Sequence, residues 1–252
     1  MAVAACSASR SHTLLAAQCA LTSPGRAFIR ISQRRPLVRR IGLLVTCLFC
    51  LVLSGGVAAR GGYLDIVPLF WRSLYPDGGR GLYCGRRFGA HDRRYNIEHV
   101  FPMAWVARQL KCGDRQQCRR RSEQFNRIES DMHNMFPARK DLNQMRGAYA
   151  FGIIKGERWA VPGCDFEVDD RRRRVEPRPA ARGDIARAML YMADRYHLTL
   201  FRRQRELMLR WHRQDPPDDT ERRRNRIIQR VQGNGNPWIE PPRKRRRERN
   251  QG

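Results

Sequence analysis

Residues 129–152 read ESDMHNMFPARKDLNQMRGAYAFG, and this stretch decides the fold expected around the candidate site. Pro137 can open a helix, because proline lacks only an N–H group that would have no partner in the first turn. That helix would run to about Ile153. Asn143 and Arg146 are three residues apart and would share one of its faces. The stretch therefore predicts a helix that presents an amide and a guanidinium group together.

A short strand is expected upstream, where residues 95–100 read YNIEHV and Pro102 follows. Glu98 and His99 lie at its end. A neutral imidazole can accept a proton from water near pH 7, and carboxylate and amide oxygens suit Mg²⁺. An adjacent Glu-His pair is common on protein surfaces. A functional interpretation of the pair is favoured here because His, Asn and Arg also cluster in residues 129–152.

The rest of the chain is expected to be mainly helical. Residues 60–93 predict only a short helix near 67–74, residues 106–132 a helical region broken by the loop from Cys112 to Cys118, and residues 155–181 loops and short strands. An amphipathic helix is expected over 182–197, with core positions at Ile185, Met189, Met192 and Tyr196. A second helix would carry Leu200, Leu207 and Trp211, and a third would cover residues 220–232.

Residues 1–59 are interpreted as a leader. Arg39 and Arg40 precede an apolar h-region at 41–56, and the small residues 57–59 suit cleavage after Ala59. A membrane anchor is the alternative, but the strongly apolar part is short for a bilayer. The long segment upstream leaves open a true start nearer Val38. The domain division is a leader (1–59), one folded domain (60–240) and a disordered basic tail (241–252).

Four cysteines remain in the mature part, namely Cys84, Cys112, Cys118 and Cys164. In an exported domain they predict two disulfides, and three pairings are possible. Zinc is the alternative. The spacing of Cys112 and Cys118 is wider than that of a typical zinc pair, so disulfides are favoured.

The composition points to a polyanionic partner. The chain has 50 Lys and Arg residues against 24 Asp and Glu, a formal charge of +26, and its hydrophobic fraction of 41% allows one sizeable core. Removing residues 1–59, with seven arginines and no acid, leaves +19. A proteome-wide arginine bias would explain part of this excess. Nucleic acid and an anionic membrane surface both fit the charge.

Several motifs, in order, resemble the bacterial endonuclease I family of periplasmic and secreted nucleases. They are YCG (83–85), EHVFPMAW (98–105), ESDMHNMFP (129–137), RGDIARAMLYM (182–192), YHLTL (196–200) and VQGNGNPW (231–238). The resemblance spans residues 80–240. It implies an α+β fold, a mainly helical domain built around a ββα-metal (His-Me finger) motif.

The same resemblance implies roles for individual residues. The catalytic residues are then His99 as general base, Arg115 on the phosphate and Glu129 as an acidic site residue; the metal ligands are Glu98 and Asn143; Asn134 fixes the loop that carries the base. Arg146 is added as a supporting residue because it shares a helix face with Asn143. His133 is interpreted as a packed histidine. Relatives often carry a second cysteine just after YCG and another in an insertion before the Glu-His pair. Here Arg86 replaces the first and the insertion is missing, which implies that the remaining pairs are Cys84–Cys164 and Cys112–Cys118.

The expected function is an exported, metal-dependent endonuclease without sequence specificity. It would cleave double- and single-stranded DNA, and RNA, to 5′-phosphate products, using one Mg²⁺ ion, with Mn²⁺ or Ca²⁺ as alternatives. A periplasmic or secreted monomer is expected, with no stable membrane association after cleavage of the leader. The alternatives are a noncatalytic arginine-rich nucleic-acid-binding protein derived from a nuclease, and a membrane-anchored nuclease.

Overall fold

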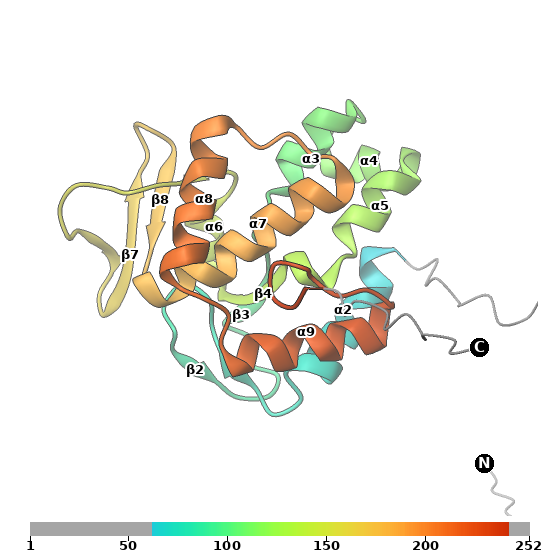
Figure 1. Cartoon of the computed structure of the whole chain (residues 1–252), viewed down its shortest axis with the longest axis horizontal. Coiled ribbons are helices and arrows are strands. Elements are labelled where there is room, and N and C mark those ends of the chain that lie inside the picture. Colours follow the sequence, from blue (N-terminus) through green and yellow to red (C-terminus); the bar gives the residue numbers. More distant parts are fainter. Residues whose placement is uncertain (1–61, 242–252) are drawn as a thin grey trace, which may run out of the picture. The chain divides into compact units, whose positions relative to one another are not determined.

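The computed structural model describes residues 62–241 (Figure 1). Helix α7 (Arg182–Tyr196) contributes many of the buried side chains of its hydrophobic core. It packs against α8 (Arg202–Gln214), whose Leu207 and Trp211 are buried. Ile185, Met189 and Met192 have no exposed surface. The helix expected over 182–197 is therefore confirmed together with three of its core positions, and the fourth, Tyr196, is half-buried against the core. Apolar side chains at spacings of three and four explain the packing, because they form one stripe along the helix.

Apart from α6, which is described with the ribbon below, the other helices of the described residues are α2 (Tyr63–Leu74), α3 (Met103–Leu110), α4 (Arg115–Arg121), α5 (Glu123–Glu129) and α9 (Asp219–Gln232), with 3-10 turns η1 (Met132–Asn134) and η2 (Pro179–Ala181). Helix α2 packs on α9 through a smaller core of Ile66, Phe70 and Ile228. It begins at Tyr63, so the helix expected near 67–74 is longer than predicted.

A two-stranded antiparallel ribbon joins β3 (Tyr95–His99) to β4 (Met135–Arg139). The register pairs Tyr95 with Arg139 and His99 with Met135. Helix α6 (Lys140–Arg146) follows β4 directly and packs against both strands. The strand expected at 95–100 is confirmed, and it brings Glu98 and His99 beside the helix that carries Asn143.

The expectation that Pro137 opens a helix reaching Ile153 is wrong. Pro137 lies inside β4, opposite Ile97, and α6 ends at Arg146, where Gly147 takes a positive φ of 48°. The carbonyl of Pro137 accepts a hydrogen bond from Leu82 N, on the side away from β3. The nitrogen of the same residue points to that side too, so the missing N–H costs the ribbon no hydrogen bond.

A four-stranded sheet covers part of the region expected to hold loops and short strands. Its order is β5 (Ala150–Phe151), β8 (Arg174–Pro177), β7 (Cys164–Asp169) and β6 (Trp159–Val161), and only the β5–β8 pair is parallel. A third, small sheet joins β1 (Gly79–Arg80) to β2 (Arg87–Phe88). The mixture of helices with small, mainly antiparallel sheets makes the fold α+β, as expected.

Two disulfides are present, Cys84–Cys164 and Cys112–Cys118. They are the pairs implied by the family resemblance, and the zinc alternative does not apply. The first attaches the segment before β2 to β7, and the second closes the loop between α3 and α4.

No helix among residues 62–241 has the length and apolar character needed to cross a membrane. The expected leader at 1–59 and almost all of the expected basic tail lie outside the described residues.

Candidate active site

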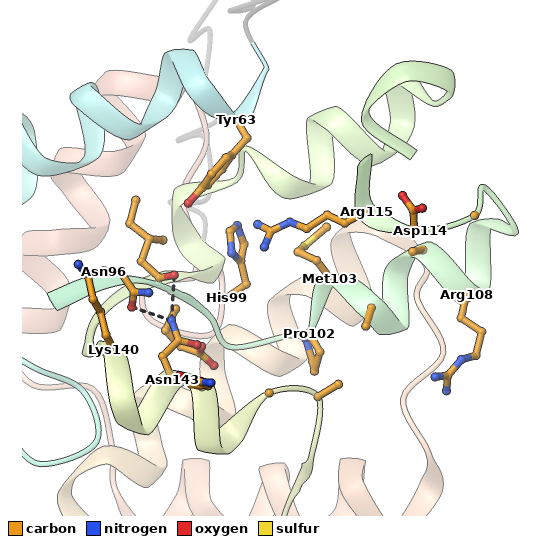
Figure 2. A pocket seen from close by; sticks show the side chains of 18 of the residues that line it. Tyr63, Asn96, His99, Pro102, Met103, Arg108, Asp114, Arg115, Lys140 and Asn143 are labelled. Atoms are coloured by element: carbon orange, nitrogen blue, oxygen red, sulfur yellow. Dashed lines mark hydrogen bonds between the residues drawn. The ribbon is translucent and has the colours of Figure 1, made fainter. Parts of the chain in front are cut away.

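The ribbon, α6 and the start of α4 surround a cavity of about 1200 Å³ (Figure 2). Glu98 and His99 reach it from β3, Asn143 and Lys140 from α6, and Arg115 from α4. Figure 2 shows Tyr63 of α2 extending over His99 at the edge of this cavity. Thus the fold brings together four of the residues expected at the site, although they come from three separate segments of the chain.

His99 is held as a neutral imidazole with one defined free nitrogen. Its Nε2 lies 2.9 Å from the carbonyl oxygen of Glu129, which can only accept, so Nε2 carries the proton. Nδ1 is then the unprotonated nitrogen. Burial and the nearby Arg115 guanidinium lower the pKa of His99 from 6.5 to about 4. The ring is 7% exposed and stacks at a tilt on Tyr63, with 5.3 Å between ring centroids.

In the metal-free protein, His99 should therefore be neutral at pH 6.5 and take up a proton only near pH 4. Because the unfolded chain binds that proton near pH 6.5, stability should fall as the pH drops from about 6.5 to about 4. Long-range ¹H–¹⁵N NMR correlations of the ring would report both the pKa and the protonated nitrogen. Titration near pH 6.5 would contradict this account.

Two side-chain oxygens in the cavity have no hydrogen-bond partner in the described part of the chain. The Glu98 carboxylate uses Oε1 alone, which accepts from Tyr83 Oη and from Arg146 Nη1, each at 2.7 Å. Asn143 donates from Nδ2 to Asn96 Oδ1 at 2.8 Å and to Ile97 O at 3.2 Å. Oε2 of Glu98 and Oδ1 of Asn143 thus remain available to a ligand.

Arg146 lies behind this site as a structural clamp. It is 1% exposed, and besides Glu98 it donates to the backbone carbonyls of His99 and Val100. Burial raises the pKa of the Glu98 carboxyl, whereas the charge of Arg146 opposes that rise. Arg146 therefore favours the charged form of the carboxylate and holds the end of β3 against α6.

Arg115 is positioned by Glu129, which does not line the cavity. The Glu129 carboxylate is fully buried and accepts from Arg115 Nε and, at 2.7 and 2.8 Å, from two nitrogens of Arg119. Both guanidinium groups also lie over the ring of Tyr63, at 5.3 and 4.9 Å from its centroid. Glu129 acts on the site through Arg115 and through its backbone carbonyl on His99.

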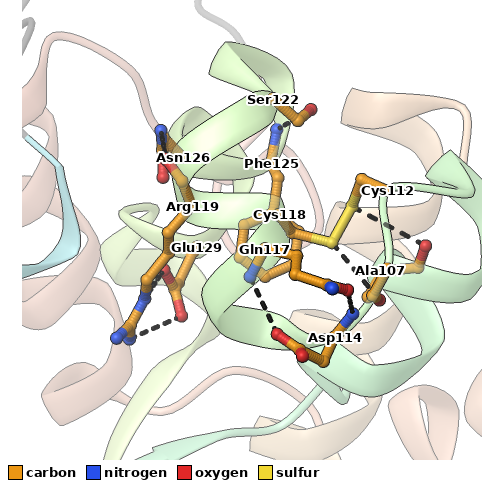
Figure 3. Close-up of a disulfide and its surroundings, with 11 residues drawn as sticks. Ala107, Cys112, Asp114, Gln117, Cys118, Arg119, Ser122, Phe125, Asn126 and Glu129 are labelled. Carbon is orange, nitrogen blue, oxygen red and sulfur yellow. Dashed lines mark hydrogen bonds and ion pairs between the residues drawn. A yellow bond between two sulfur atoms is a disulfide. The ribbon is translucent and has the colours of Figure 1, made fainter.

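The Cys112–Cys118 disulfide brackets the segment that carries Arg115 (Figure 3). Within this loop, Asp114 caps α4: its carboxylate accepts from Gln117 N at 2.8 Å, and its own N–H donates to Gln117 Oε1 at 2.9 Å. The short covalent loop and the reciprocal cap fix where α4 begins, and Arg115 is its first residue.

Asn134 holds the backbone just after His99. Its side chain accepts from Phe101 N at 2.6 Å and donates to Phe101 O at 3.0 Å, and its carbonyl accepts from Val100 N. His133 lies away from the cavity, with 1% exposure, Nε2 on Asn234 O at 3.0 Å, and its ring against Tyr191. The interpretation of His133 as a packed histidine is confirmed.

Five residues at or behind the site carried no expected role: Tyr63, Tyr83, Asn96, Arg119 and Lys140. Tyr83 belongs to the YCG motif, so its position in that motif was a usable signal. Tyr63, Asn96 and Arg119 had none, because Tyr63 meets Arg119, and Asn96 meets Asn143, only in the folded chain. Lys140 is distinguished in the sequence only as one of the few lysines in an arginine-rich chain.

Comparison with known proteins finds one matching family model and several similar nucleases. The family model for Endonuclease I matches residues 75–243. A periplasmic deoxyribonuclease of Aeromonas hydrophila is 40% identical over 173 residues, which cover 67% of this chain and 73% of the relative. An extracellular deoxyribonuclease of the same organism is 43% identical over 173 residues, with 67% and 75% covered. An extracellular ribonuclease of Bacillus subtilis (strain 168) is 34% identical over 131 residues, with 45% and 44% covered.

Proposed function

Because this chain belongs to the endonuclease I family, we propose that it is an exported, metal-dependent endonuclease that hydrolyses DNA without sequence specificity. The observation that carries the proposal is the convergence of a neutral histidine and two unpartnered oxygens in one cavity. The deoxyribonucleases among its relatives support DNA as the substrate, and the Bacillus relative supports RNA as a second one.

The donor set fits one hard divalent cation. A carboxylate oxygen of Glu98 and the amide oxygen of Asn143 are the ligands that Mg²⁺ prefers, and Mn²⁺ or Ca²⁺ would accept them too. Tyr83 and Arg146 occupy the other Glu98 oxygen, and Asn96 orients the Asn143 amide. When bound, the ion would neutralise negative charge on the phosphate and on the departing 3′-oxygen. The β3–β4 ribbon and α6 then form the ββα-metal motif.

The chain's own residues supply the proton transfer and the orientation. Nδ1 of His99 takes a proton from water as the water oxygen attacks phosphorus; the bond to the 3′-oxygen breaks, and that oxygen takes up a proton from solvent. The products carry a 5′-phosphate and a 3′-hydroxyl. Nε2 keeps its proton, because it donates a hydrogen bond to Glu129 O throughout the reaction. Arg115 steadies the phosphate, and Glu129 holds Arg115 as a positioning residue.

Export rests on the relatives and on the disulfides. The two Aeromonas relatives are a periplasmic and an extracellular enzyme, and disulfides persist in such oxidising compartments. We propose that the leader is cut after Ala59 and that the enzyme acts as a periplasmic or secreted monomer. N-terminal sequencing of the purified protein would reveal the cut, and an intact leader would favour the anchored form.

Plasmid nicking by the purified, disulfide-intact protein tests the function. Nicking with Mg²⁺ that stops in EDTA is the expected result. Tight DNA binding without any nicking, at every divalent ion tried, would favour the noncatalytic nucleic-acid-binding alternative.

Asn143→Ala should raise the Mg²⁺ concentration for half-maximal nicking by at least about 10–100-fold, because residues that only support metal ligands already contribute that much. Gln144→Ala is the matched control. Gln144 is the next residue on α6 and also lines the cavity, but it is exposed and forms no hydrogen bond with Asn96 or Glu98. An unchanged Mg²⁺ requirement in Asn143→Ala would remove Asn143 from the metal site.

A further inference from the structure

A second cavity, the basic groove, lies at the opposite end of the β3–β4 ribbon from His99. It measures about 480 Å³ and is lined by Arg86, Arg87, Arg94, Tyr95, Arg139, Lys140 and Asp141. Five of these seven side chains are cationic and one is acidic. Such a concave cluster of guanidinium groups suits an anion with several oxygens.

The acids near the groove only partly balance its charge. Arg94 pairs with Asp92 at 2.7 Å, and Arg139 pairs with Asp141. Arg86 donates to the carbonyls of Pro162 and Gly163, which leave its charge uncompensated. Among residues 62–241, neither Arg87 nor Lys140 forms an ion pair. Two acids therefore face five cations, which leaves a surplus of positive charge for a further anion.

The basic groove adjoins the catalytic cavity, which is the cavity lined by Glu98, His99 and Asn143. Lys140 lines both of them. Strand β3 connects them as well, since Tyr95 lies in the groove and His99 in the catalytic cavity. Four steps along a strand span about 13 Å. Along a DNA duplex, that distance corresponds to about four phosphates of one strand.

We propose that the basic groove binds backbone phosphates of the same nucleic acid that occupies the catalytic cavity, about four phosphates from the bond that is cut. This inference rests on the proposed function for the identity of the polyanion. It assigns Arg87 and Arg94 to substrate binding at a distance from the chemistry. An anionic membrane is the competing partner for the same charges.

Salt-dependent binding tests the groove without cleavage. Fluorescence anisotropy of a labelled 20-base-pair duplex in EDTA gives the slope of log K against log salt concentration. Arg87→Gln/Arg94→Gln should make that slope shallower by up to about 0.9 for each phosphate that the variant no longer neutralises, and so by about 2.

The matched control is Arg171→Gln/Arg172→Gln. It also removes two exposed arginines, one of them paired with a nearby acid, and neither residue lines the groove or the catalytic cavity. Arg87→Lys/Arg94→Lys keeps the charge and should restore most of the slope. A groove variant whose slope equals that of the control would overturn the proposal. Binding of the same variants to phosphatidylglycerol vesicles tests the membrane alternative: a groove variant that loses binding to vesicles but not to DNA would also overturn the proposal.

Cleavage kinetics distinguish this proposal from the proposed function. With long DNA, the groove variant should raise KM and leave kcat unchanged. With a substrate of about four nucleotides, too short to reach the groove, it should behave like the control. If the wild-type protein cuts nothing, the proposed function fails, but the binding slopes still show whether the groove binds backbone phosphates.

Discussion

Replacing His99 with alanine should lower the rate of DNA cleavage by about 10²–10⁴-fold, the usual contribution of a general base. The variant loses the only imidazole that lines the catalytic cavity in the described part of the chain. Binding of DNA in EDTA should persist, because the cationic side chains remain. Single-turnover cleavage with saturating Mg²⁺ would measure the loss in the chemical step.

His133→Ala is the matched control for this variant. His133 is also buried and also places Nε2 on a backbone carbonyl, but it faces Tyr191 rather than the cavity. Both variants should lose comparable stability in urea, while only His99→Ala loses cleavage. If the two variants lost activity equally, the effect would be one of folding, and His99 would no longer be the base.

Arg146→Met should lower the free energy of unfolding by about 3–5 kcal/mol, because it leaves the buried Glu98 carboxylate without its cation. The backbone carbonyls of His99 and Val100 would lose their donor in the same step. Urea denaturation followed by tryptophan fluorescence would measure the change. Cleavage should fall as well, since the same clamp holds the end of β3.

Two variants identify the cause of that loss. Arg202→Met removes one partner of an exposed ion pair, with Glu206 at 3.1 Å, and should cost no more than about 1 kcal/mol. Glu98→Gln/Arg146→Met removes both buried charges, so it should be more stable than Arg146→Met alone. A double variant that is even less stable would show that the packing of the Arg146 side chain, and not the unpaired carboxylate, sets the cost.

The helices around the core could be predicted from the sequence because each carries its own signal. Ile185, Met189 and Met192 repeat at helical spacing, and their burial follows directly from that pattern. Strand β4 could not be predicted in this way. Pro137 matches the start of a helix, and only the pairing with β3 makes a strand possible there. Local preference was overridden by a long-range contact.

In the candidate site, too, some residues could be predicted from the sequence and others could not. Glu98, His99 and Asn143 were identified through family motifs, and their meeting in one cavity depends on the ribbon register. The contacts behind them join residues far apart in sequence, such as Tyr83 with Glu98 or Arg146 with Val100. No local pattern encodes such pairs. Arg146 was placed correctly on the face of Asn143, but its role as a clamp required the fold.

The partner that fixes the tautomer of His99 is a main-chain atom, the carbonyl oxygen of residue 129. Every amino acid supplies that oxygen, so no point mutation can delete it as long as α5 keeps its path. The hydrogen bond from His99 Nε2 therefore does not depend on which amino acid occupies position 129. The side chain of Glu129, by contrast, accepts hydrogen bonds from the two arginines. A substitution at position 129 would therefore release Arg115 and Arg119 while the hydrogen bond to Nε2 of His99 stays in place.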